Sequence, residues 1–172
     1  VSIRRQGGRM AATVEAELSR AQKAGVVIKV NDEAYVVAWR FDRMRKPFVG
    51  IDDVKLVDGE WLDIGGNAWP ADAVASLAAA ITEIAADRTP PPLTDPLHVE
   101  LAKREKSPHD HTRVITIDNK SVLVVYPMMY DGTPSVMVRN YEHKKRAWDF
   151  TCYDIIRMPV AIQIAAYVMN TR

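Results

Sequence analysis

Short runs in which apolar and polar residues alternate cover most of the first half of the chain, and this alternation is typical of half-buried β-strands. The runs are Val26 to Val30, Ala34 to Phe41, Phe48 to Leu56 and a stretch around Trp61. Polar turn residues, Asn31-Asp32-Glu33 and Asp58-Gly59, separate runs that are rich in β-branched and aromatic side chains. We therefore expect four antiparallel strands joined by tight turns.

The spacing of apolar residues changes after these runs from alternation to a helical period. Gly65-Gly66-Asn67 reads as a loop, and Pro70 stands where a first helical turn begins. From Pro70 to Ala86 one helical stripe contains Val74, Leu77, Ala78, Ile81 and Ile84. This predicts a helix that covers one face of its own sheet and leaves the opposite face free.

The same pattern occurs a second time at an offset of 87 residues. Residues 28–39 (IKVNDEAYVVAW) align without a gap with residues 115–126 (ITIDNKSVLVVY), and Trp61 falls on Trp148. The second set of strands is Arg113 to Ile117, Ser121 to Tyr126, Val136 to Tyr141 and a stretch around Trp148, followed by a helix from Pro159 to Met169. A fixed period of this length predicts two copies of one supersecondary unit.

The predicted fold class is α+β, with two tandem β-β-β-β-α repeats whose antiparallel sheets are each covered by a helix and related by a pseudo-twofold axis. Leu97 to Lys106 resembles Val14 to Lys23, so a short helix is expected before each first strand. Thr89 to Pro96 reads as a stiff linker because its prolines fix the backbone. The predicted organisation is residues 1–23 (N-terminal segment with a short helix), 24–88 (first repeat), 89–110 (proline-rich linker and short helix) and 111–172 (second repeat).

Composition places the chain among ordinary globular proteins. Its 172 residues are 48% hydrophobic and 26% charged, with a net charge of +1 and a single cysteine, Cys152. A lone cysteine cannot form an internal disulfide, which favours a reducing, cytoplasmic location. No apolar run approaches the ~20 residues needed to span a bilayer. Val1 to Met10 lacks the apolar core of a signal peptide, and both Val1 and Met10 are candidate starts.

Signatures of catalysis are missing from the sequence. There is no G-x-x-x-x-G-K-[ST] phosphate loop, no G-x-S-x-G elbow and no H-E-x-x-H zinc helix. His109-Asp110-His111 is interpreted as a solvated linker, since zinc normally takes four converging ligands. We therefore expect a protein that is not an enzyme and that has no catalytic residues, cofactor or metal.

Basic and aromatic residues cluster around one predicted turn in each repeat, and such interleaving is what single-stranded nucleic acid requires for phosphate contact and base stacking. The candidate nucleic-acid-binding residues are Trp39, Arg40, Arg43, Arg45, Lys46 and Phe48 in the first repeat and Arg139, Tyr141, Lys144, Lys145 and Arg146 in the second. Strand alternation puts Tyr35, Val37 and Trp39 on one face and the small residues on the other, and leaves open which set faces the helix. The competing interpretation is that the tryptophans are core residues and the basic turns are solvated loops.

Four strands followed by a helix, with basic hairpins, resemble the positive-cofactor-four transcriptional coactivator family, and two copies in one chain resemble the Whirly proteins. Val136 to Tyr141 followed by a basic turn is similar to the third strand and hairpin of the coactivator family, although the signature segments of both families are absent. The resemblance implies a non-enzymatic protein that binds single-stranded DNA or RNA and forms dimers. Viral roles and accessory roles in replication, recombination or transcription are open. The alternative is an interaction module that forms a homodimer through its sheet faces.

Overall fold

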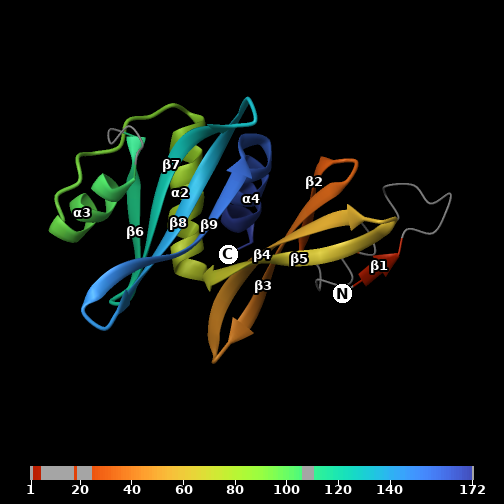
Figure 1. Ribbon diagram of the computed structural model, residues 1–172, viewed down its shortest axis with the longest axis horizontal. Helices are drawn as coiled ribbons and strands as arrows, with labels where there is room; N and C mark the ends of the chain where they lie inside the picture. Colours follow the sequence, from red (N-terminus) through yellow and green to blue (C-terminus); the bar gives the residue numbers. More distant parts are fainter. Residues whose placement is uncertain (1, 5–17, 19–24, 106–110, 172) are drawn as a thin grey trace. The chain divides into compact units, whose positions relative to one another are not determined.

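The computed structural model describes residues 2–4, 18, 25–105 and 111–171 (Figure 1). By contacts between residues the chain divides into two compact units, Val1–Ala71 and Asp72–Arg172. Each unit is built on one antiparallel sheet. The expectation of an α+β fold with two tandem sheets is confirmed.

The sheet of the first unit contains the four predicted strands and one short strand that the sequence did not predict. The strands are β1 (Ser2–Arg4), β2 (Val26–Asn31), β3 (Ala34–Arg43), β4 (Lys46–Val57) and β5 (Glu60–Pro70). They lie in the order β1-β5-β4-β3-β2. At the β2–β3 turn the Asn31 side chain accepts a hydrogen bond from the Glu33 amide at 2.8 Å, which is the Asx geometry that a short polar turn favours.

The second unit contains the other sheet and three described helices. Its elements are α2 (Ala71–Ala85), α3 (Pro96–Arg104), β6 (Arg113–Asp118), β7 (Ser121–Tyr130), β8 (Thr133–Lys144), β9 (Ala147–Arg157) and α4 (Met158–Asn170), and the sheet order is β6-β7-β8-β9. Asp95 caps α3 by accepting a hydrogen bond from the Leu97 amide at 2.8 Å, and Pro96 occupies the first turn. The predicted helices after each set of four strands are confirmed, as is the short helix within the 89–110 segment.

The 87-residue period holds position for position. The bounds of β3, β4 and β5 coincide, 87 residues on, with those of β7, β8 and β9, and α2 and α4 begin at equivalent residues. Leu56 donates to the Glu33 carbonyl at 2.8 Å, and the equivalent His143 donates to the Lys120 carbonyl at the same distance. The strand irregularities also coincide. The two repeats therefore differ in side chains and not in backbone plan, while their relation by a pseudo-twofold axis stays a prediction.

The boundary between the units lies earlier than the proline-rich segment at 89–110. Contacts group α2 with the second unit, although it follows the strands of the first. Arg113, at the start of β6, forms an ion pair with Glu83 of α2 at 3.2 Å and donates to the Arg88 carbonyl at 2.7 Å. The apolar stripe of α2 is buried as predicted, but helical periodicity does not specify which sheet a stripe meets.

Both faces of the second sheet are covered at its centre, so the expectation of a free face opposite the helix is wrong there. Leu101 of α3 packs with Val122, Val124 and Met137. The intervening residues Leu123 and Val125 point the other way and are also fully buried, and α4 contacts β8 and β9. The physical reason is the additional helix α3, which occupies the face that would otherwise be open.

In the first unit, both faces of β3 are buried. Tyr35 and Val37 form a core with Leu18, and the alternate residues Val36 and Ala38 are buried as well. Trp61 belongs to the same core and is 2% exposed, which supports the core interpretation for this tryptophan. In the described part of the first unit, the partly exposed aromatic side chains therefore lie nearer the turn between β3 and β4, at Trp39, Phe41 and Phe48.

Gly65-Gly66-Asn67 is part of β5 and not a loop, which corrects the interpretation of this segment. Gly65 has φ of 112°, a left-handed conformation that glycine adopts without strain, and its amide donates to Asp63 at 2.9 Å. A Cβ on Gly66 would lie 2.0 Å from the Ile51 carbonyl oxygen. The glycines thus create a bulge and a close approach that let β5 continue to Pro70.

Candidate functional site

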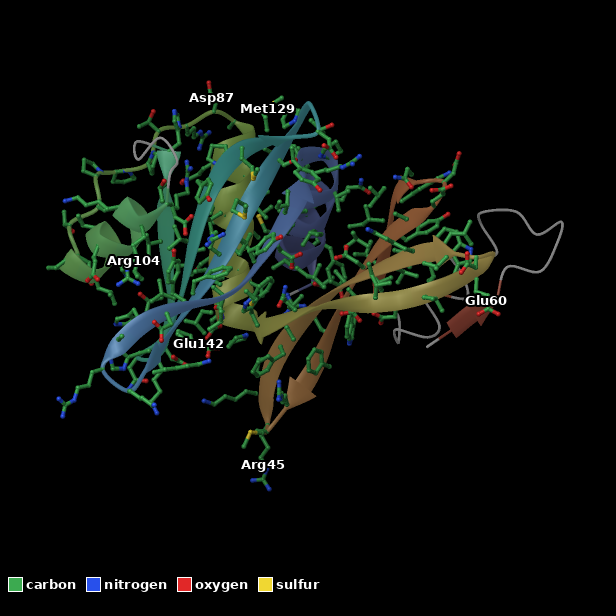
Figure 2. All side chains as sticks on the ribbon, viewed as in Figure 1. Arg45, Glu60, Asp87, Arg104, Met129 and Glu142 are labelled. Atoms are coloured by element: carbon green, nitrogen blue, oxygen red, sulfur yellow. The ribbon has the colours of Figure 1, made fainter. Side chains whose placement is uncertain are left out.

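The β3–β4 hairpin ends in a two-residue turn, Met44-Arg45, in which both residues have positive φ, 51° and 61°. Such turns match the twist of antiparallel strands. The turn places Arg43 opposite Lys46 and presents Arg45 at the tip (Figure 2). All three cations are exposed, so the predicted basic cluster exists at this end of the hairpin.

Three aromatic rings follow the same hairpin on one face, and we call Trp39, Phe41 and Phe48 the aromatic row. The Trp39 and Phe41 ring centroids are 5.8 Å apart, and those of Phe41 and Phe48 are 5.9 Å apart, with interplanar angles of 26° and 29°. Each ring is partly exposed. The Arg43 guanidinium lies 6.0 Å from the Phe48 centroid, so the row ends beside the basic turn.

Not every predicted residue joins the row. Arg40 alternates with Trp39 and Phe41 along β3, so its side chain points to the opposite face of the sheet. The structure thus brings together Trp39, Arg43, Arg45, Lys46 and Phe48, with Phe41 between them. Phe41 was noted in the sequence beside the turn but was not included among the candidates.

In the second unit the predicted cations lie at the β8–β9 hairpin. Lys145 and Arg146 form its turn, and with Lys144 they are exposed. Lys144 lies 3.6 Å from the Glu142 carboxylate, an exposed ion pair of small energetic value. The sequence favours a turn over Glu142 to Arg146, but Glu142 to Lys144 belong to β8, so the turn is shorter.

Tyr141 is buried, so the prediction that it is an exposed stacking residue is wrong. It is 3% exposed, and its hydroxyl donates to Glu105, the residue that ends α3. Tyr126 donates to the other oxygen of the same carboxylate at 3.0 Å. Burial, reinforced by Glu105, raises the pKa of each phenol to about 12, so both keep their protons at neutral pH.

Arg139 joins this buried cluster to the surface. Its Nε lies 2.8 Å from Glu105 Oε1, and its guanidinium carbon lies 3.8 Å from the Phe150 centroid and 5.9 Å from that of Tyr153. Phe150 and Tyr153 are 41% and 55% exposed, and neither was among the predicted site residues. Alternation from Trp148 could have identified Phe150, whereas the irregularity between Asn140 and Tyr141 shifts the register that would have indicated Tyr153.

The rings and the cations change hairpins together between the repeats. In the first repeat the aromatic row and its cations lie on the hairpin of the second and third strands. In the second repeat Phe150, Tyr153 and the basic turn lie on that of the third and fourth, while the exposed ring of Tyr130 lies beside the β7–β8 turn. The positions equivalent to Trp39, Phe41 and Phe48 are Tyr126, which is buried, Met128 and Ser135. The other hairpin of each repeat ends in Asp-Gly, Asp58-Gly59 or Asp131-Gly132.

A pair of carboxyl groups lies on the first sheet. Burial raises the pKa of Asp52 to about 7, and the hydrogen bond to Asp63 and the negative charge of Asp63 act in the same direction. The position equivalent to Asp52 in the second repeat is Arg139. The same place in the backbone therefore holds a proton-sharing acid in one unit and a guanidinium in the other.

Two absences apply to the part of the chain that the structure describes. No group of three or more His, Cys, Asp or Glu side chains there is placed to hold a metal ion, while His109 and Asp110 lie outside the described residues. None of the described helices has the length and apolarity to cross a bilayer.

In comparisons of sequence, the chain matches no protein-family model and no curated protein.

Proposed function

We propose that the protein binds single-stranded nucleic acid without acting as an enzyme. One observation carries the proposal: exposed rings and exposed cations occur on the same hairpin in both repeats, although the hairpin differs. This shared placement supports a joint role for the rings and the cations on each of the two hairpins. A role on single strands is also what the resemblance to the positive-cofactor-four and Whirly families implies.

The chemistry of the aromatic row suits an unpaired strand. Bases stack on partly exposed rings without regard to sequence, and Arg43, Arg45 and Lys46 stand where phosphates would follow. In a duplex the base faces are already stacked on one another and are not available. The proposal includes a cytoplasmic location, which a single cysteine, Cys152, favours.

The test is the anisotropy of a labelled oligonucleotide titrated with the protein. Single strands should bind more tightly than a duplex of the same length, and log affinity should fall linearly with log salt concentration. Trp39→Ala should weaken binding by roughly 1 to 3 kcal/mol. Met44→Ala is the matched control, since Met44 is 91% exposed on the same hairpin but has no ring. No binding of the wild-type protein at low salt would exclude the function.

A second candidate is an interaction module, and the β7–β8 hairpin favours it. Met129, labelled in Figure 2, is 62% exposed next to its turn, and the adjacent Tyr130 is 42% exposed. Exposed apolar groups that are adjacent often contact a partner. Sedimentation of the wild-type protein and of Met129→Ser distinguishes the two functions, because a homodimer that uses this tip would dissociate in the variant.

A further inference from the structure

We propose that Phe150 and Tyr153 of β9 form a second base-stacking site for single-stranded nucleic acid, with Arg139 fixed beneath them as a positioning residue. The inference rests on the proposed function and adds to it the residues of the second unit that contact bases. The sequence assigned this role to Tyr141, which the structure buries.

The rings of Phe150 and Tyr153 are stacked next to each other on the surface. Their centroids are 6.2 Å apart and their planes differ by 27°, so they are offset and nearly parallel. Both lie on β9 directly opposite a residue of β8, Phe150 opposite Tyr141 and Tyr153 opposite Arg139, so their backbone is ordered before any ligand binds. Aromatic residues with few rotatable bonds, already in place, lose little conformational freedom when a base stacks on them.

Arg139 and Glu105 determine which face of the Phe150 ring is open to a base. The guanidinium occupies one face of Phe150 at 3.8 Å, a cation–π contact, and the ion pair to Glu105 at 2.8 Å keeps it there. Glu105 is in turn held by the hydroxyls of Tyr126 and Tyr141. A base can therefore stack only from the solvent side, onto rings whose inner side is already supported.

The charges on β8 and β9 are divided between the two faces of the hairpin, and this favours a polyanion over another protein. Alternation places Glu142, Asp149 and Asp154 on the face opposite the rings. The face with the rings carries Arg139 and His143, and Arg104 of α3 lies 6.0 Å from the Tyr141 centroid while it also pairs with Glu100. On β8 and β9 no carboxylate shares the face with the rings.

The experiment compares a labelled oligothymidine with an abasic oligodeoxyribose phosphate of the same length. Wild type should prefer the strand with bases, because the abasic strand offers only phosphates. Tyr153→Ala and Phe150→Ala should each bind oligothymidine about 5- to 150-fold more weakly, with little change toward the abasic strand. Tyr153→Phe retains the ring and should bind like wild type.

Ile162→Ala is the matched control, since Ile162 is an exposed apolar residue of α4 at 46%. Arg139→Lys keeps the charge but removes the planar guanidinium from the Phe150 ring, so it should lower affinity for oligothymidine with an unchanged salt dependence. In Arg139→Gln the salt slope should also stay unchanged, because a positioning residue contacts no phosphate, whereas a shallower slope would show that Arg139 contacts one. If wild type and the Trp39 variant behave as proposed but both β9 variants match Ile162→Ala, the second site is excluded and the proposed function stands. If wild type binds neither strand, the proposed function falls and this site with it. Loss of a homodimer in Tyr153→Ala, with unchanged oligothymidine affinity, would also overturn the site.

Discussion

The indole of Trp39 lies across Gly50 of the neighbouring strand, so closely that a Cβ at position 50 would be 2.7 Å from two atoms of the ring. The two residues are direct partners in the β3–β4 ladder. Glycine at this position is thus required by the ring and not by an unusual backbone conformation.

Gly50→Ala should displace the Trp39 ring and disturb its stacking on Phe41. Oligonucleotide affinity should fall by an amount similar to that of Trp39→Ala, roughly 1 to 3 kcal/mol, because the same stacking surface is lost. Anisotropy measures the affinity, and tryptophan fluorescence reports the changed environment of the ring. Unchanged affinity together with a shifted emission spectrum would show that the aromatic row is not the contact surface.

The basic turns should contribute to the salt dependence of binding. Replacement of Arg43, Arg45 and Lys46 by Ala should make the slope of log affinity against log salt shallower by up to about 2 units, at about 0.7 per single-strand phosphate contact. In the second unit, replacement of Lys144, Lys145 and Arg146 by Ala should change the slope less, since Lys144 is already paired with Glu142. Equal slopes for wild type and both variants would contradict phosphate contact by these turns.

The apolar stripes of α2 and α4 should be important for stability. Leu77 and Ile164 occupy equivalent positions, and each is 1% exposed. Leu77→Ala and Ile164→Ala should each lower the free energy of unfolding by roughly 2 to 5 kcal/mol, as expected when a buried side chain is truncated and leaves a cavity. Urea denaturation measures the change, and the exposed Ile162→Ala should leave the midpoint almost unaltered.

The raised pKa of Asp52, about 7, should make the stability of the first unit depend on pH. The folded chain retains this proton at a pH where the unfolded chain, with an ordinary carboxyl pKa near 3.8, has lost it. The stabilisation is complete below that lower value and is lost as pH rises toward 7. Asp52→Asn, which cannot ionise, should remove this loss, so the variant should be more stable than wild type at pH 8. Parallel stability profiles for the two proteins would refute the shared proton.

The phenols of Tyr126 and Tyr141 should ionise at a pH well above that of an ordinary tyrosine side chain. Because folding raises their pKa values to about 12, the stability that they contribute is lost as pH rises from about 10 through 12. Absorbance near the tyrosinate band measures the ionisation. Glu105→Gln removes a negative charge beside both hydroxyls and should lower both pKa values, whereas Tyr153→Phe should leave this late phase intact.

The repeated backbone plan could be predicted from the sequence because its signal is local. Alternation of apolar residues identifies strands such as β3 and β7, and the shared offset identifies the second copy. The grouping of α2 with the second unit could not be predicted, since a buried stripe does not specify its partner. The hydrogen bonds from Tyr126 and Tyr141 to Glu105 could not be predicted for a similar reason, because the two hydroxyl donors lie 21 and 36 residues further along the chain.

The strands of the two copies have equal lengths, so their surfaces differ without any strand being longer or shorter. Val54 stands where Tyr141 stands 87 residues later, and Asp52 stands where Arg139 does. One backbone plan thus accommodates an aliphatic group or a phenol, and an acid or a guanidinium, at the same two places. The two copies thus share strand lengths and turns while their side chains, and therefore their surfaces, differ.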